Sequence, residues 1–234
     1  TRDFAMNITK LLTLLLTLSV ISFTPHLDSN PKPERTPASA ESDIYPYRVT
    51  SKAPHDMRVI NSGIAALYGR IDLIRRAQKT LELEYFIFNP DHSGRIVLRE
   101  LINASKRGVK VRILVDKSMA VFVLDKYYAA ALKEHNIELR YYNNASALAL
   151  SSVQFRNHRK LLAMDNIEAI TGGRNIGNEY FDLSEEFNFL DRDSWIKGEI
   201  VSAMTETFDR YWKNSIVEIP RKLKEPKRRV SVGK

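Results

Sequence analysis

The residues best suited to chemistry lie in one stretch, residues 155–182, which reads FRNHRKLLAMDNIEAITGGRNIGNEYFD. Within it, His158 and Lys160 are two residues apart and lead into the apolar run LLAM. Side chains two residues apart on a β-strand share one face of the sheet. The spacing therefore predicts a strand on which His158 and Lys160 project side by side, while Asn157 and Arg159 point the other way.

Three further features follow at fixed spacing. Asp165 and Asn166 make a predicted turn, after which IEAIT is expected to run back as a neighbouring strand. That strand ends at the pair Gly172-Gly173, where the backbone can approach a ligand closely. Asn175 lies just past this edge. The pattern H-x-K-x4-D-x6-G-G-x-N thus predicts an imidazole, an ammonium and a carboxamide at one edge of a sheet.

These groups suit a phosphodiester substrate. An imidazole can attack phosphorus and form a covalent intermediate, which replaces one difficult displacement by two easier ones. Phosphoryl transfer otherwise requires positioning and stabilisation of the oxygens on phosphorus, for which Lys160 and Asn175 are suitable donors. One preorganised donor is typically worth about 10²–10³ in rate, and a general acid adds roughly 10²–10⁴. The scheme requires neither a metal ion nor another cofactor.

The elements that must position these residues alternate between helix and strand. Apolar spacing predicts helices over residues 60–78, 95–108, 124–136 and 203–214, and strands over residues 80–88, 109–116 and 137–142. Alternating strands and helices of this length predict a parallel α/β sheet with right-handed crossover connections. The motif segment follows the last of these strands, after the polar stretch NNASALALSS.

Composition limits the alternatives. The chain has 234 residues, no cysteine and a net charge of +8. The absence of cysteine excludes disulfides, thiolate zinc sites and cysteine nucleophiles. Residues 221–234 contain seven Lys or Arg and one Glu, a net charge of +6, which leaves +2 for the rest of the chain. This basic tail is either a contact for anionic lipid or nucleic acid, or a solvated end.

The N-terminal residues predict targeting and not fold. Lys10 precedes the uncharged run Leu11–Phe23, whose 13 residues are too few for a bilayer that needs ~20. Residues 1–23 are therefore interpreted as a cleaved signal peptide, with an uncleaved anchor and a first core helix as alternatives. Residues 24–44, rich in Pro and Ser, predict a linker, and the catalytic domain is expected over residues 45–220.

The spaced motif resembles the HKD motif of the phospholipase D superfamily. Its segments RNHRKLLAMD and GGRNIGNEYFD are most similar to those of bacterial cardiolipin synthases and their relatives, and the resemblance covers about Met57–Ile219. It implies a phospholipase D-like fold, a mixed and mostly parallel β-sheet flanked by helices on both faces. It also implies His158 as the nucleophile or the acid, and Lys160 and Asn175 as phosphate ligands.

The resemblance assigns the remaining site residues. Asp165 would orient the loop, and the backbone at Gly172 and Gly173 would face the phosphate. Family sites also use a carboxylate on a following strand to hold the second nitrogen of the histidine. For that role the sequence FLDRDSWIKG supplies Asp193 as the first choice, with Asp191 and then Glu186 behind it.

The number of motifs is the main departure from the family. Cardiolipin synthases resemble two fused halves with one HKD motif each, and one histidine attacks while the other protonates the leaving group. This chain has a single H-x-K pair, at His158 and Lys160. Either a homodimer brings two copies of His158 together at its two-fold axis, or the chain is one half of a two-motif enzyme.

The leading hypothesis is a metal-independent phosphodiesterase or phosphatidyltransferase that acts on phospholipids through a phosphohistidine intermediate, as a homodimer. It would be exported or associated with the cell envelope of a bacterium. The first alternative is a single-motif endonuclease of the same superfamily, with nucleic acid as its partner. The second is a catalytically incomplete half that serves as a partner at an anionic membrane surface.

Overall fold

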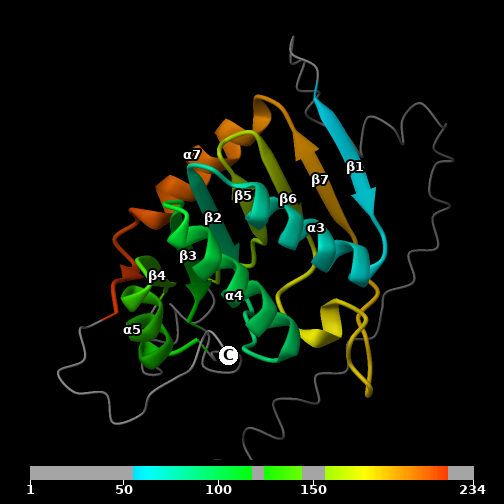
Figure 1. Ribbon diagram of the computed structural model, residues 1–234, viewed down its shortest axis with the longest axis horizontal. Coiled ribbons are helices and arrows are strands. Elements are labelled where there is room, and N and C mark those ends of the chain that lie inside the picture. Colours follow the sequence, from blue (N-terminus) through cyan, green and yellow to red (C-terminus); the bar gives the residue numbers. More distant parts are fainter. Residues whose placement is uncertain (1–54, 118–123, 144–155, 221–234) are drawn as a thin grey trace, which may run out of the picture. The chain divides into compact units, whose positions relative to one another are not determined.

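The computed structural model of the chain describes residues 55–117, 124–143 and 156–220. These residues form an α/β unit, and Figure 1 shows helices α3 and α4 crossing the front of its sheet. The predicted signal or anchor (1–23), the linker (24–44) and the basic tail (221–234) lie outside the described residues. None of the helices within the described ranges is long and apolar enough to cross a membrane.

A single sheet runs through the described residues, in the order β1-β7-β6-β5-β2-β3-β4-β8. Strands β2, β3 and β4 are parallel to one another. The other pairings are antiparallel. The strands are β1 (Asp56–Ile60), β2 (Thr80–Tyr85), β3 (Lys110–Asp116), β4 (Ile137–Tyr142), β5 (Leu161–Met164), β6 (Glu168–Gly172), β7 (Asp193–Lys197) and β8 (Val217–Glu218).

The helices begin at side-chain caps that the sequence supplies. Ser62, Asp91 and Asp125 each accept a hydrogen bond from a backbone N–H of the first turn that follows, which satisfies a donor that has no partner inside the helix. The elements are α3 (Gly63–Arg76), α4 (His92–Lys106), α5 (Lys126–Glu134), the 3₁₀ turn η1 (Asn178–Tyr180) and α7 (Ile200–Trp212).

The two faces of the sheet pack against different helices. On β2, Leu81 and Leu83 belong to the larger apolar core, which also contains side chains of α3, α4 and α5. The smaller core, on the opposite face, packs against α7. There the buried Glu82 accepts a hydrogen bond from Arg112 of β3, which also donates to Asp209 of α7. Helices on both faces of a mixed sheet confirm the predicted fold class.

The direction of the strands differs in part from the prediction. The parallel arrangement holds for β2, β3 and β4, which helices connect, whereas β5, β6 and β7 alternate in direction. The turn at Asp165 and Asn166 explains the change, because both residues have positive φ, 53° and 59°. A short turn with this left-handed backbone joins antiparallel strands and cannot make a parallel crossover.

The predicted strand around His158 begins later than expected. Residues 156–160 are not part of a strand, and β5 starts at Leu161. Polar partners hold this segment in place of a ladder: the backbone N–H of Asn157 donates to Asp116 (2.8 Å) and its side chain donates to Glu84. His158 and Lys160 therefore lie on the approach to β5 and not on the strand itself.

Candidate active site

The candidate site lies at the edge of the sheet formed by strand ends, where the start of β5 meets the carboxyl ends of β2 and β6. Strand β5 is antiparallel to both β2 and β6, so its first residue lies beside the last residues of those two strands. Glu84 faces Leu161 across one pairing, and Thr171 faces Leu161 across the other. His158 and Lys160 precede Leu161, and Asn175 follows the end of β6. The topology therefore brings the three predicted groups to the same edge.

His158 and Lys160 are in direct contact. The Lys160 ammonium lies 2.9 Å from Nδ1 of His158 and donates to its carbonyl oxygen at 2.6 Å. Because an ammonium has no acceptor lone pair, it donates to Nδ1, and the proton of a neutral His158 is then on Nε2. The His158 ring packs against Phe86, with 4.7 Å between ring centroids.

Burial lowers the pKa values of both groups, and the Lys160 charge lowers that of His158 further. The pKa of His158 is lowered by desolvation and then by the Lys160 charge, while Asp116 acts in the opposite direction. Desolvation lowers the pKa of Lys160 to about 8, against the attraction of Asp191. A depressed histidine pKa favours the neutral imidazole, which is the form that can act as a nucleophile.

Two buried acids that the sequence interpretation overlooked anchor the segment before His158. Asp116, at the end of β3, accepts from the backbone of Asn157 and from Arg156 (3.0 Å). Glu84, near the end of β2, accepts from the Asn157 side chain. Burial raises the pKa of both carboxyls. Their signal was present in the sequence, because each interrupts an apolar strand close to its C-terminal end.

Asn175 is fixed by the loop that follows β2. Its Oδ1 accepts from the backbone N–H of Ile87 at 3.0 Å. The next residue, Ile176, donates to the Ile87 carbonyl at 3.2 Å and accepts from Asn89 at 2.9 Å. Since Oδ1 is engaged by the backbone, the Nδ2 hydrogens are the donors that Asn175 can offer to a ligand. The Asn175 amide also lies near the Tyr180 hydroxyl, whose pKa is raised by desolvation and lowered by this amide.

The glycine pair is held between carboxylates. A Cβ on Gly172 would meet the Arg192 carbonyl and the side chain and backbone of Asp193. A Cβ on Gly173 would overlap the carboxylate of Asp191. Asp191 therefore covers the second glycine and lies close enough to Lys160 to oppose the lowering of its pKa.

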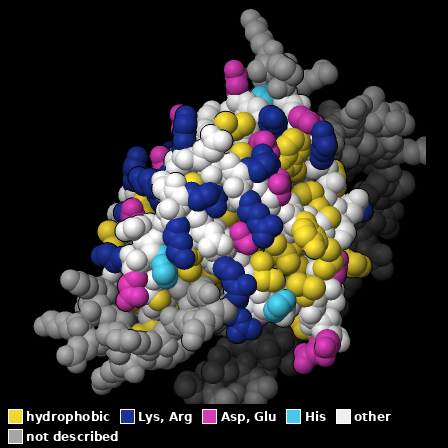
Figure 2. Space-filling model, in the orientation of Figure 1, with side chains coloured by type: hydrophobic (Ala, Val, Ile, Leu, Met, Phe, Trp, Pro, Cys, Tyr) yellow, Lys and Arg dark blue, Asp and Glu magenta, His cyan; other side chains and the backbone are white. Residues whose placement is uncertain are grey.

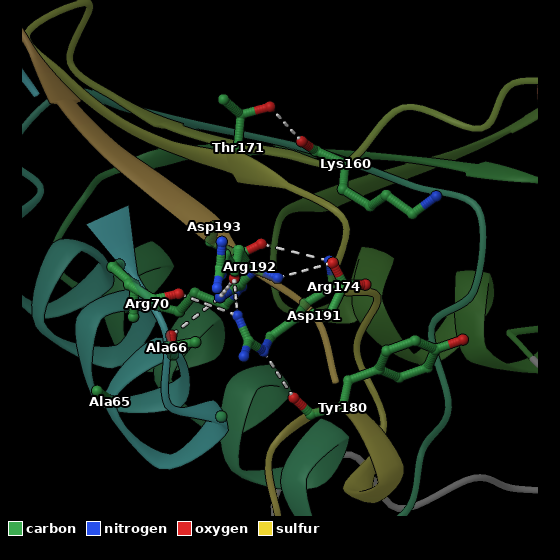
Figure 3. A network of polar contacts seen from close by, with 12 residues as sticks. Ala65, Ala66, Arg70, Lys160, Thr171, Arg174, Tyr180, Asp191, Arg192 and Asp193 are labelled. Carbon is green, nitrogen blue, oxygen red and sulfur yellow. Dashed lines mark hydrogen bonds and ion pairs between the residues drawn. The ribbon is translucent and has the colours of Figure 1, made fainter. Parts of the chain in front are cut away.

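The structure corrects the first choice for the carboxylate partner of the histidine. Asp193 is buried on the other side of the glycine pair, where Oδ2 accepts from Arg70 at 2.9 Å and lies 3.7 Å from Arg174 (Figure 3). Its Oδ1 accepts from the backbone of Arg174 at 3.3 Å. Two buried cations require a counter-charge, and Asp193 supplies it. Of the alternatives, Asp191 borders the site, and Glu186 is exposed on the loop before it.

Asp165 does not join these groups. It follows β5 at the opposite edge of the sheet, where its carboxylate accepts from the backbone N–H groups of Gln78, Lys79 and Thr80 at 2.9, 2.8 and 2.7 Å. These contacts tie the β5–β6 turn to the start of β2. Across the described ranges, no cluster of three or more His, Asp or Glu side chains is arranged to hold a metal ion.

Comparison with known proteins identifies the family to which the chain belongs. The family described as "Cardiolipin synthase, PLD-like domain" matches residues 71–212. An uncharacterised protein of Helicobacter pylori strain 26695 is 34% identical over 188 residues, which are 73% of this chain and 36% of that protein. Cardiolipin synthase C of Escherichia coli K12 is 33% identical over 162 residues, 65% of this chain and 34% of that one. The chain thus spans about a third of the length of these curated relatives.

Two solved structures share the fold. Phosphatidylserine synthase of Haemophilus influenzae aligns with a TM-score of 0.58 over 74% of this chain and 40% of its own, at 18% identity. Nuc from Salmonella typhimurium, a phospholipase D family member, aligns with a TM-score of 0.53 over 68% of this chain and 95% of its own, also at 18% identity. At this identity the likeness concerns the fold alone.

Proposed function

The chain belongs to the phospholipase D-like family that includes the cardiolipin synthases, and on this premise we propose that it provides one catalytic motif of a metal-independent phosphodiesterase or phosphatidyltransferase. The proposed substrate is a phospholipid, and the proposed intermediate is a phosphohistidine on His158. One observation carries the proposal: a histidine with a lowered pKa contacts a buried lysine, at the sheet edge that also carries Asn175.

The proposed reaction has two displacements. In the first, a nitrogen of neutral His158 attacks phosphorus, the P–N bond forms, and the P–O bond to the leaving alkoxide breaks as that oxygen takes a proton from a second acid. In the second, a hydroxyl of water or an alcohol attacks the phosphohistidine and gives its proton to the same group. A P–O bond then forms, the P–N bond breaks, and His158 is restored.

Lys160 and Asn175 would stabilise the charged oxygens on phosphorus. In the absence of substrate, the Lys160 ammonium donates to Nδ1 of His158. A phosphodiester anion is a stronger acceptor than a neutral imidazole, so we expect Lys160 to turn to the phosphate when substrate binds. His158 is then able to adopt the tautomer with the proton on Nδ1, which frees Nε2 for attack.

The second acid is proposed to be the histidine of another HKD motif. The sequence holds a single H-x-K pair, and the curated relatives are about three times as long as the matched segment. A second copy in a symmetric dimer, or a second half outside this chain, would complete the site. Export or attachment to the cell envelope is also proposed, from the apolar run within residues 1–23.

The surface beside the site favours a lipid over a nucleic acid. Residues 179–190 carry four acids and no Lys or Arg: Glu179, Asp182, Glu185 and Glu186. A nucleic-acid backbone is bound mainly by cations that neutralise its phosphates, so this loop would repel it. Arg156 and Arg159 precede and follow His158, but each is paired with a buried acid. An endonuclease is therefore the second candidate.

The test is turnover of phosphatidylglycerol vesicles by the full chain in excess EDTA, beside His158→Ala. Headgroup release or lipid transfer that survives EDTA and is lost in the variant supports the proposal. Turnover of single-stranded DNA that falls steeply with salt, without turnover of lipid, would transfer the assignment to the endonuclease. No turnover of lipid, DNA or a water-soluble diester would overturn the proposal for this chain alone and leave the incomplete half.

A further inference from the structure

The loop between η1 and β7 presents apolar side chains to solvent. Phe187 is 55% exposed, Phe189 is 44% exposed, and Leu190 is fully exposed at 104%. Figure 2 shows hydrophobic side chains gathered on the right half of the visible face, around α3. Within the loop, Phe187 and Phe189 are in contact, and exposed apolar side chains that lie together mark interaction surfaces more often than isolated ones do.

A chain of contacts joins this loop to the phosphate ligands. The side chain of Tyr180 lies near that of Asn175: desolvation raises the pKa of the Tyr180 hydroxyl, and the Asn175 amide lowers it. The ring of Tyr180 stacks on Phe189, with 4.9 Å between centroids and 27° between planes. Phe189 in turn meets Phe187 edge to face at 5.2 Å. Figure 3 shows Tyr180 and Lys160 extending to the same side of the buried network. Aromatic rings therefore lead outward from the phosphate site to the exposed tip.

Hydrogen bonds hold the loop in this form. The backbone N–H of Phe189 donates to the Glu179 carbonyl at 2.8 Å. Asn188 accepts from the backbone of Ser184 at 3.1 Å and donates to its carbonyl at 3.0 Å. These bonds fix the two ends of the segment that carries the apolar side chains. The fold therefore keeps these side chains exposed. Because the loop is already ordered, binding of a partner does not have to order it at a cost in entropy.

We propose that the loop of residues 183–191 inserts Phe187 and Leu190 into the apolar layer of a lipid surface. The proposal rests on the proposed function, because a phospholipid bound by its phosphate at Lys160 and Asn175 extends its acyl part away from the site. Glu185 and Glu186, exposed on the same loop, disfavour a nucleic-acid strand. They also mean that attachment of this loop depends on apolar burial and not on charge.

A tryptophan placed at the tip tests the insertion directly. Leu190→Trp is compared with Ile167→Trp in the full chain, because Ile167 is 48% exposed but lies in the β5–β6 turn at the opposite edge of the sheet. The probe is vesicles of equimolar phosphatidylcholine and phosphatidylglycerol, with brominated phosphatidylcholine as the quencher. The signal of Trp195 and Trp212 is subtracted with the unsubstituted chain.

We expect a blue shift and bromine quenching for Leu190→Trp that added salt does not weaken, and neither effect for Ile167→Trp. Equal responses of the two variants would overturn the proposal. So would a blue shift that appears without vesicles and grows with protein concentration, because it would show contact between copies of the chain. This measurement reads insertion even if the chain alone has no turnover.

A second comparison separates this inference from the proposed function. The double variant Phe187→Ser, Leu190→Ser should lose about tenfold in turnover of vesicles, with turnover of the water-soluble bis(p-nitrophenyl) phosphate unchanged. The control Ile167→Ser should change neither. Equal loss on both substrates would overturn the insertion, because it would show damage to the site. Retention of both activities in His158→Ala would instead overturn the proposed function.

Discussion

Replacement of Asp165 should remove stability and leave the chemistry intact. The residue occupies the aspartate position of the HKD motif, yet it lies at the far end of β5 from His158. Its carboxylate accepts three backbone hydrogen bonds from the connection between α3 and β2, two on Oδ1 and one on Oδ2. Its own N–H donates to the Thr80 carbonyl at 3.1 Å. The side chain thus ties the β5–β6 turn to the start of β2.

The expected loss in the free energy of unfolding follows from these hydrogen bonds and from the backbone conformation of Asp165. A typical hydrogen bond contributes ~0.5–1.5 kcal/mol, and two of the three here are exposed, so their loss costs about 2 kcal/mol. Asp165 has a φ of 53°, and alanine in this left-handed region adds about 1 kcal/mol. Asp165→Ala should therefore lower the free energy of unfolding by about 3 kcal/mol. Asp165→Asn keeps Oδ1 and tolerates this φ, so its cost should be about 1 kcal/mol.

The assay is urea denaturation followed by circular dichroism, with turnover of a water-soluble diester measured well below each unfolding midpoint. Glu185→Ala, a change at an exposed acid on the 183–191 loop, is the control and should stay within about 0.5 kcal/mol. Per folded molecule, Asp165→Ala should retain its turnover. An Asp165→Ala variant that is as stable as the unsubstituted chain but inactive would refute this reasoning and place Asp165 in the chemistry.

Three further outcomes are expected. Asp193→Asn leaves two buried arginines without their counter-charge and should cost about 3–5 kcal/mol in the free energy of unfolding; a cost below about 1 kcal/mol would contradict the network. Gly172→Ala should destabilise the protein more than Gly173→Ala in the same denaturation assay. The reason is that the Cβ at residue 172 meets backbone atoms, whereas the Cβ at residue 173 meets only the Asp191 carboxylate, which can move. A larger loss of stability for Gly173→Ala would contradict this geometry. Turnover of a soluble diester should fall as pH rises through about 8, where Lys160 loses its charge. Lys160→Arg stays charged, so turnover of this variant should not fall in that range. If the pH profile of Lys160→Arg is the same as that of the unsubstituted chain, Lys160 is not the cause of the fall.

Much of the fold could be predicted because its patterns are local. The predicted helices over residues 60–78, 95–108, 124–136 and 203–214 correspond to α3, α4, α5 and α7, with ends shifted by up to three residues. Apolar spacing and capping residues determine such elements within one segment of chain. Strand direction depends on connections between segments. The turn at Asp165 indicated that β6 runs back beside β5, which is confirmed, but the antiparallel pairing of β5 with β2 and of β6 with β7 was not predicted.

The sequence predicted the site residues that belong to the motif, but not the residues that hold the motif in place through tertiary contacts. The spacing located His158, Lys160 and Asn175 at one edge, although the strand that was expected to carry the first two begins only after them. Asp116 and Glu84 were overlooked although both lie within predicted strands, 109–116 and 80–88, because an acid in a strand is more often exposed than buried. Their partners lie in residues 156–159, about 40 and 70 positions along the chain, and sequence pattern does not show contacts of that separation.

The carboxylate pair at the start of β7 shows why the glycine pair is required. Glycine at 172 and 173 was interpreted as room for a ligand, but the space beside each Cα is taken by Asp193 on one side and by Asp191 on the other. Asp193 holds Arg174, the residue between the glycines and Asn175. The buried charges therefore act on the segment that carries Asn175 and not on the histidine. It follows that loss of Asp193 should displace Asn175 and reduce diester turnover per folded molecule, whereas loss of Asp165, which is equally tied to the fold but remote from this segment, should not.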